Sequence, residues 1–422
     1  METLSPADLA AIESRGLTEA EVARQLALFR DPPPPQRLAR AATPGDGVVR
    51  LEEREHAELL NLADGAARAG RLTKFVPASG AASRMFASIL AGAAESPEKR
   101  RFFENADSFA FSGDLDRLAS TPKGLLPFHR YGEDSRTAFE EQLFEAAGTV
   151  RDAAGICRVH FTVSPEHRGA FAAKLAEVRP RVERATGARF EVSFSEQAPS
   201  TDTIAGGADE GPFRTASGAL LFRPGGHGAL VGNLGDVAWA GGDIVLVKNI
   251  DNVVPDARRG QTLLWKRLLT GLLVRIERSS PRNRPIRVCG VVRNEGEPGG
   301  GPFWVSGPGG ESLQIVESAQ VDLKDGAQAR IWNSATHFNP VDLACSLRDG
   351  TGKPFDLARF VDEQAVFVAE KTHEGKPLKA LERPGLWNGA MAFWETVFVE
   401  VPKETFAPVK TVLDLLRPEH RA

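Results

Sequence analysis

The spacing of hydrophobic positions along the chain changes near residue 73. Residues 5–30 have the pattern of two helices, and residues 51–70 return to helical spacing after the stiff run Pro32–Pro35. Beyond residue 73, short apolar runs of strand length alternate with longer helical stretches. Such an alternation is typical of a doubly wound, mostly parallel sheet with helices on both faces. We therefore predict an α/β fold of the Rossmann-like type, preceded by an N-terminal helical cap that packs on it.

The expected elements can be placed by residue number. Strands are predicted over 74–78, 157–164, 189–195, 243–248 and 286–292, and helices over 85–94, 137–148, 166–186 and 261–278. The Gly- and Pro-rich stretch 295–310 predicts a loop or hairpin, and the chain beyond 355 a mixture of short strands and helices. The pattern divides the chain into a helical region (1–70), a main α/β domain (71–345) and a small C-terminal α+β portion (346–422).

Composition narrows the class of protein. The formal net charge of −4 over 422 residues argues against a surface that coats nucleic acid. Cys157, Cys289 and Cys345 are far apart, which excludes a disulfide framework and argues against a zinc site. The sequence has no apolar run of about 18 residues, and its start lacks the features of a signal peptide. We expect a cytoplasmic protein that acts on small molecules, with neither nucleic acid nor a membrane as partner.

A loop of small residues directly follows the first strand of the main domain. It consists of Ala78, Ser79, Gly80, Ala81, Ala82 and Ser83, and Arg84 opens the next helix. Small residues let backbone N–H groups approach a polyphosphate closely, and a helix N-terminus favours negative charge. The guanidinium of Arg84 adds a planar set of donors for phosphate oxygens. The loop by itself is equally compatible with an ordinary turn between a strand and a helix.

Three further segments carry residues suited to phosphates or to a metal ion. Lys123 lies between two prolines, and His227 is flanked by glycines that let a ligand approach the backbone. Asp251 follows a buried strand, and ligands of open α/β sheets bind beyond the carboxyl ends of strands. Mg²⁺ usually takes one or two protein carboxylates together with substrate phosphates, so Asp251 is a candidate Mg²⁺ ligand. Each segment alone is also compatible with a turn at the surface.

Taken in order, these segments resemble the UDP-sugar pyrophosphorylase branch of the nucleotidyltransferases. That branch includes UTP–glucose-1-phosphate uridylyltransferase and UDP-N-acetylhexosamine pyrophosphorylase. The resemblance extends over residues 73–416 and is carried by Pro77 to Met85, Lys123, Phe194 to Gln197, Pro224 to Gly228, Asn249 to Asn252, Gly299 to Gly301, Leu313 to Glu317, Phe338 to Leu343, Phe406 to Lys410 and Asp414 to Leu416. The whole chain is also similar to a bacterial family known as domain of unknown function 4301.

The chain departs from the pattern of that superfamily at three points. Ala82 stands where the phosphate loop usually has glycine, and an insertion places Lys123 39 residues after Arg84. Val341 or Asp342 replaces an asparagine of the segment that begins at residue 338. The last departure bears on sugar specificity more than on nucleotide binding.

The resemblance implies that a sugar 1-phosphate oxygen attacks the α-phosphorus of an NTP, with UTP favoured, and that pyrophosphate leaves. It implies catalytic roles for Arg84, Lys123 and Lys410 at the phosphates, and Mg²⁺ held by Asp251. The other implied site residues are, for the nucleotide, Ala78, Ser79, Gly80, Ala81, Ala82, Ser83, Gln197, Gly226 and His227, and, for the sugar phosphate, Asn249, Gly300, Glu317 and Asn339.

Two other functions stay open on the sequence alone. A glycosyltransferase of similar architecture would consume a nucleotide sugar and normally carries an Asp-x-Asp motif, to which Asn249-Ile250-Asp251 is a near relative. A nucleotide-binding protein without turnover would use the same fold, and Ala82 and the insertion before Lys123 are the features that favour it. The sequence leaves the sugar, the base and the oligomeric state open.

Overall fold

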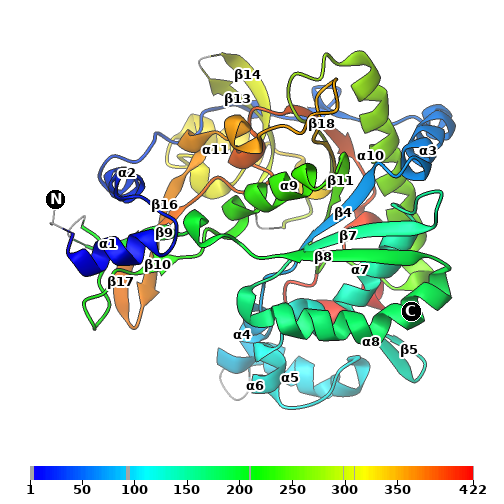
Figure 1. Cartoon of the computed structure of the whole chain (residues 1–422), viewed down its shortest axis with the longest axis horizontal. Helices are drawn as coiled ribbons and strands as arrows, with labels where there is room; N and C mark the ends of the chain where they lie inside the picture. The colour runs from blue at the N-terminus through cyan, green and yellow to red at the C-terminus, as the bar shows by residue number, and fades with distance from the viewer. Residues whose placement is uncertain (1–3, 92–95, 209–210, 298, 308, 422) are drawn as a thin grey trace.

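A nine-stranded sheet forms the centre of the molecule (Figure 1). The computed structural model describes residues 4–91, 96–208, 211–297, 299–307 and 309–421. From one edge to the other, the strands are β2 (Thr43–Pro44), β3 (Gly47–Val49), β18 (Glu395–Glu400), β12 (Ile286–Arg293), β15 (His337–Ser346), β11 (Ile244–Val247), β4 (Leu72–Pro77), β7 (Ile156–Thr162) and β8 (Arg189–Ser195). β15 runs antiparallel to β11 and β12, and the other adjacent pairs are parallel. The predicted α/β fold with a mostly parallel sheet is confirmed.

Helices cover both faces of this sheet. One face packs against α7 (Ala138–Ala147), α8 (Arg168–Thr186) and α10 (Arg259–Ser279), with α3 (Glu53–Arg68) in the same core, and the other packs against α9 (Leu230–Trp239). The two layers are visible in β11, where Ile244 and Leu246 belong to the core beneath α10, whereas Val245 and Val247 belong to the core beneath α9. A strand that is buried on both faces has a continuous apolar sequence, which is why the hydrophobic pattern predicts it.

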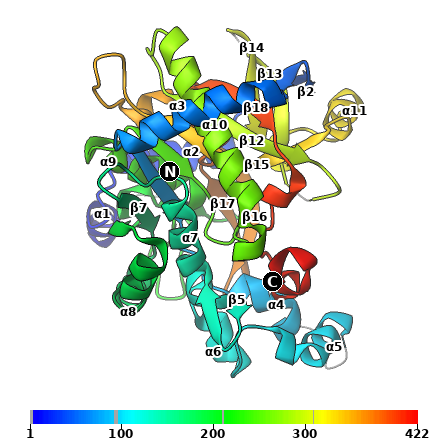
Figure 2. The same ribbon diagram turned by 90° about the vertical axis from the view of Figure 1, so that its right-hand side faces the viewer.

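α3 and α10 cross at very short range. A Cβ atom built on Gly271 of α10 would lie 2.0 Å from the carbonyl oxygen of Leu59 in α3. Only glycine therefore lets the two helices approach this closely. This contact holds α3 on the outer face of α10, as Figure 2 shows.

The N-terminal region is helical only in part. α1 (Pro6–Glu13) and α2 (Glu19–Arg30) form as expected, and Ser5 caps the first of them. Residues 38–49, however, form β1 (Leu38–Ala41), β2 and β3, so the prediction of an all-helical cap is wrong there. β1 pairs with β13 (Gly301–Gly307), and β3 joins β18. These very short strands are stabilised by partners far away in the sequence, so they leave no local pattern.

A smaller sheet forms an accessory lobe together with α1 and α2. Its strands, in spatial order, are β10 (Phe222–Arg223), β9 (Thr203–Gly206), β17 (Lys376–Glu382) and β16 (Phe367–His373). Val22 and Phe29 of α2 share a core with Ile204 of β9 and Leu381 of β17. The first two helices therefore pack on this lobe, which Figure 1 shows on the side of the molecule opposite to α3.

Two excursions complete the fold. The first contains α4 (Ser83–Ala91), α5 (Pro97–Glu104), α6 (Leu115–Ser120) and the hairpin of β5 (Pro127–Tyr131) and β6 (Asp134–Thr137). The second contains β13, β14 (Gly310–Val316) and α11 (Gly326–Asn333), and the β13–β14 hairpin agrees with the prediction for 295–310. The predicted helix 85–94 corresponds to α4, and its last three positions lie outside the described residues. No described helix has both the length and the apolar character needed to cross a bilayer.

Candidate active site

The segments that carry the predicted ligands begin at the carboxyl ends of neighbouring strands. β4 leads into the small-residue loop 78–83, β8 leads into Gln197, and β11 leads into the segment 249–252. Because β11, β4, β7 and β8 are parallel, these carboxyl ends lie at one edge of the sheet. The order of strands thus brings together segments that are distant in the sequence.

The small-residue loop is fastened to the Lys123 segment by its backbone. The N–H of Ala82 donates to the carbonyl of Thr121 at 3.0 Å, and the N–H of Lys123 donates to the carbonyl of Gly80 at 3.1 Å. The insertion between Arg84 and Lys123 is therefore a helical excursion that returns to the loop, and it does not separate the two halves of the site.

Ala82 anchors the loop in the main hydrophobic core. Its side chain is fully buried in the main core, and its N–H is already bonded, so its methyl group faces the protein interior. The N–H groups of Ser79, Gly80 and Ala81 make no hydrogen bond to any described residue. These three groups, followed by the exposed Arg84 in the first turn of α4, are the donors available to an anion.

Lys123 and Asp251 form an ion pair beside this loop, and the backbone of Lys410 lies next to that of Asp251. The Lys123 Nζ lies 2.5 Å from an Asp251 carboxylate oxygen, and their side chains are 14% and 18% exposed. The Asp251 carbonyl accepts from the N–H of Val409 at 3.1 Å, which places Lys410 next to this ion pair along the chain. Asp414 accepts from the N–H of Lys410 at 2.9 Å and so fixes its backbone.

Buried amides hold the 249–252 segment. Gln142 of α7 donates to the carbonyl of Asn249 at 2.9 Å, and Asn252 accepts from the N–H of Ala407 at 2.9 Å. The segment is thus clamped between α7 and the C-terminal part of the chain. For Asn249, the structure shows this backbone role, and its side chain makes no hydrogen bond within the described part of the chain.

Gln197, Gly226 and His227 form the opposite side of the site. The Gln197 side-chain NH₂ donates to the Gly226 carbonyl at 2.9 Å, and Gly226 has a left-handed φ of 59° that favours glycine. His227 is an exposed residue, and the protein around its imidazole lowers the pKa of the ring by desolvation. Asp251 acts to raise this pKa and Arg84 to lower it, so both charges lie close to the imidazole.

Gly300, Glu317 and Asn339 form a third cluster. The Asn339 N–H donates to the Gly300 carbonyl at 3.1 Å, and its side-chain NH₂ donates to Glu317 at 3.1 Å. A Cβ on Gly300 would lie 2.4 Å from the Val316 carbonyl oxygen, so this approach requires glycine. Burial raises the pKa of Glu317, while Asn339 and the positive charge of Lys410 act in the opposite sense. The charge of Lys410 therefore lies near this cluster, while its backbone lies next to that of Asp251.

A buried charge cluster beneath the site is absent from the sequence-based prediction. Glu145 lies 2.9 Å from Lys74 and 2.8 Å from Lys248, and Lys266 lies 2.5 Å from Asp342. Burial lowers the pKa of Lys74 to about 7, against the opposing effect of Glu145. The sequence feature that could have indicated this cluster is a lysine in or next to each of two apolar strands. Lys74 lies in β4, and Lys248 directly follows β11. Lys248 directly precedes Asn249, so the cluster supports the segment that bears Asp251.

The fold is that of sugar-nucleotide pyrophosphorylases of known structure. The UDP-N-acetylglucosamine pyrophosphorylase from Trypanosoma brucei, in complex with an inhibitor, matches with a TM-score of 0.60 and 14% identity over 99% of this chain and 80% of that chain. A mutant UDP-glucose pyrophosphorylase from Leishmania major, in complex with UDP-glucose, matches with a TM-score of 0.56 and 17% identity over 98% and 79%. The UDP-glucose phosphorylase from Trypanosoma brucei has a TM-score of 0.55 and 18% identity over 97% and 77%.

The family follows from the sequence. The family described as Domain of unknown function (DUF4301) matches residues 5–121, 117–280 and 279–421, so the chain belongs to this family. No curated protein matches the sequence. The predicted membership is confirmed, and the likeness to the UDP-sugar pyrophosphorylases is confirmed for the fold.

Proposed function

We propose that this protein is a nucleotidyltransferase that joins an NTP to a sugar 1-phosphate and releases pyrophosphate. The observation that carries the proposal is the ion pair of Lys123 and Asp251 beside a loop with available N–H groups, with the backbone of Lys410 adjacent to that of Asp251. Two ammonium groups, one carboxylate and several backbone donors suit a polyphosphate that meets a second phosphate. The similarity of the fold to the UDP-sugar pyrophosphorylases supports the same class of reaction.

In the proposed reaction, an oxygen of the sugar 1-phosphate forms a bond to the α-phosphorus of the NTP. The bond from that phosphorus to the oxygen that bridges to the β-phosphate breaks, and pyrophosphate leaves with the electron pair. No side chain has to act as a nucleophile, so catalysis consists of alignment and charge neutralisation. The N–H groups of residues 79–81 and Arg84 bind the β- and γ-phosphates, and Lys123 and Lys410 bridge the α-phosphate and the incoming phosphate.

The donor set fits a Mg²⁺ ion. Asp251 provides one carboxylate at the phosphate edge, and no cluster of three or more His, Cys, Asp or Glu side chains suited to a metal occurs in the described ranges. Mg²⁺ is usually held by one or two carboxylates and by substrate phosphates, whereas structural zinc sites need four protein ligands. When bound, Mg²⁺ would neutralise charge on the phosphates. Asp251 also holds the Lys123 ammonium, which keeps that lysine at the phosphate end of the site.

The orientation of Gln197 favours UTP over CTP. Its NH₂ group donates to the Gly226 carbonyl, a group that can only accept, so the amide oxygen remains as an acceptor for a ligand. An acceptor pairs with the ring N–H that uracil has at N3 and that cytosine lacks there. We expect Gln197→Ala to reduce the preference for UTP over CTP in competition assays. Unchanged discrimination would remove Gln197 from base recognition.

The cluster of Gly300, Glu317 and Asn339 is the proposed sugar subsite. The Asn339 Oδ1 atom is buried without a hydrogen-bond partner in the described part of the chain, and Glu317 has a second carboxylate oxygen. Both are acceptors for sugar hydroxyl groups. Lys410, which influences Glu317, is placed to hold the phosphate of the same sugar.

The test is a direct assay of pyrophosphate release. Purified protein is incubated with Mg²⁺, each common NTP, and a panel of hexose and N-acetylhexosamine 1-phosphates. We expect release that requires both substrates and is fastest with UTP. Transfer from a UDP-sugar to an acceptor, without pyrophosphate release, would instead make the protein a glycosyltransferase. A melting temperature raised by NTPs, without turnover on any sugar phosphate, would make it a binding protein.

A further inference from the structure

Arg287 is a fully buried cation, and no carboxylate of the residues that the structure describes pairs with it. It lies in β12 and is 0% exposed. Its Nε donates to the Thr396 hydroxyl at 2.8 Å and its Nη1 to the Trp387 carbonyl at 2.5 Å, while Nη2 is buried without a partner among the described residues. Burial lowers the pKa of Arg287, and the nearby thiols of Cys289 and Cys345 act in the opposite sense.

This arrangement is costly for folding. A guanidinium stays protonated in proteins, so Arg287 remains a buried cation. An apolar residue of similar volume would pack at such a position at lower cost, because the desolvation of the charge would be avoided. The compensating role of Arg287 therefore lies in the groups that its hydrogen bonds hold.

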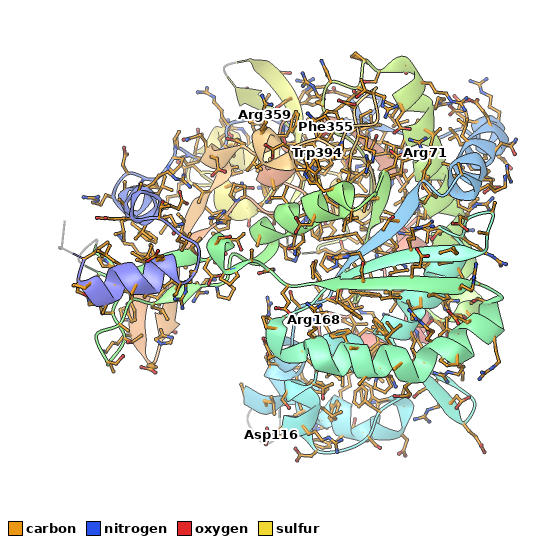
Figure 3. The ribbon with its side chains drawn as sticks, in the orientation of Figure 1. Arg71, Asp116, Arg168, Phe355, Arg359 and Trp394 are labelled. Atoms are coloured by element: carbon orange, nitrogen blue, oxygen red, sulfur yellow. The ribbon has the colours of Figure 1, made fainter. Side chains whose placement is uncertain are left out.

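Those bonds hold a turn that contains Arg383, Leu386, Trp387 and Met391. This turn lies against the nucleotide side of the proposed site. The Trp387 ring meets the His227 ring edge to face, with centroids 4.9 Å apart and planes at 90°. A Cβ on Gly228 would lie 2.5 Å from the Arg383 Cβ, so the turn and the glycine-rich segment are in direct contact. Leu386 and Met391 anchor the turn in the core that α9 shares with Val245 and Val247, and Figure 3 labels Trp394 and Phe355 in the same region.

We propose that Trp387 forms part of the wall of the nucleotide subsite beside His227, and that Arg287 is the positioning residue that holds it there. The proposal rests on the proposed function, since it assigns His227 to the nucleotide. Arg287 acts through the Trp387 carbonyl: it ties the backbone of the turn to Thr396 in β18, and so to the central sheet. The tied backbone sets the position of the indole, and the indole sets the face of the imidazole that meets the ligand.

Intrinsic tryptophan fluorescence tests whether Trp387 lines the nucleotide subsite. The chain has six tryptophans, and Trp239, which is 61% exposed on α9, provides a matched control. UTP with Mg²⁺ is titrated into the wild type, Trp387→Phe and Trp239→Phe, and UTP affinity is measured in parallel by calorimetry. We expect the emission change of the wild type to persist in Trp239→Phe and to disappear in Trp387→Phe. An emission change that survives in Trp387→Phe would overturn the proposal.

Steady-state kinetics tests the positioning role. We expect Arg287→Met to raise the KM for UTP at least tenfold and to leave the KM for the sugar 1-phosphate within threefold, with Arg287→Lys in between. A melting temperature close to that of the wild type separates this effect from unfolding. Equal changes in both KM values, or no change in either, would overturn the role of Arg287. If Arg287→Met does not fold, Arg287→Lys is judged by the same split between the KM values.

These outcomes are separable from a failure of the proposed function. If the wild type binds no NTP by calorimetry, the proposed function and this inference fall together. If the wild type binds UTP and releases pyrophosphate while Trp387 and Arg287 variants behave as the wild type, only this inference falls.

Discussion

Two aspartates on either side of β11 provide a matched test of the site. Asp243 precedes the strand and pairs with Arg71 at 2.5 Å, and Asp251 follows it and pairs with Lys123 at 2.5 Å. The two carboxylates are 22% and 18% exposed. Figure 3 labels Arg71 at the start of β4, at the end of the strands opposite to the site. We expect Asp251→Asn to lower turnover by about 10²–10³-fold and Asp243→Asn to leave it intact.

The expected losses in kcat and in Tm have different physical causes. Loss of one electrostatic contact to a developing charge typically costs about 10²–10³ in kcat, or roughly 3–4 kcal/mol. Partly exposed ion pairs contribute about 0–1 kcal/mol to stability. Unfolding entropy is roughly 2 cal/mol/K per residue, so 1 kcal/mol lowers Tm by about 1 °C in a chain of 422 residues. Both variants should therefore melt within about 2 °C of the wild type.

The assay is pyrophosphate release at saturating UTP and sugar 1-phosphate, with the melting curve of each variant recorded alongside. In Asp251→Asn the ammonium of Lys123 is no longer paired, so affinity for UTP measured without Mg²⁺ should not fall. Turnover within threefold of the wild type in Asp251→Asn would refute the role of this carboxylate. Equal losses of turnover in the two variants would show that the effect is one of folding.

Three further predictions test other parts of the site and the fold. Lys410→Ala should lower kcat by about a hundredfold or more without changing Tm, because the side chain is exposed; near-full activity would remove Lys410 from the mechanism. Burial raises the pKa of Glu317, so kcat/KM for the sugar phosphate should fall with decreasing pH at values above the ordinary range of a glutamate, as the carboxylate gains a proton. Glu317→Gln should remove this limb of the pH profile, and an unchanged profile would contradict the assignment. Gly271→Ala should destabilise the protein by about 3 kcal/mol in denaturant unfolding, whereas Gly65→Ala, where a Cβ meets no atom within 4 Å, should be neutral or stabilising by up to about 1 kcal/mol; equal effects would contradict the close helix crossing.

The local pattern of the sequence determined most elements of the main domain. The strand predicted over 189–195 coincides with β8, and the helix predicted over 261–278 lies within α10. These elements are predictable because their hydrophobic period is a local property of the chain. Three of the ordered motif segments, 78–83, 194–197 and 249–252, reach the carboxyl ends of the parallel strands β4, β8 and β11, and the roles of their residues stay predictions. Short strands such as β1 and β3 were not predictable, since they are held by pairing near residues 303 and 398.

Only the tertiary structure decided how the candidate residues meet. From the sequence, Ala82 and the 39-residue separation of Lys123 from Arg84 count as departures from the pattern of the nucleotidyltransferases. In the fold, the Ala82 methyl group is buried, and the insertion returns so that the backbone of Lys123 bonds to that of Gly80. The ion pair of Lys123 and Asp251 joins segments that share no local pattern. The buried charges of Lys74 and Arg287 were also beyond prediction, because their partners are set by packing between layers. Periodicity reports which face of an element is buried, and the three-dimensional arrangement of elements decides what that face contacts.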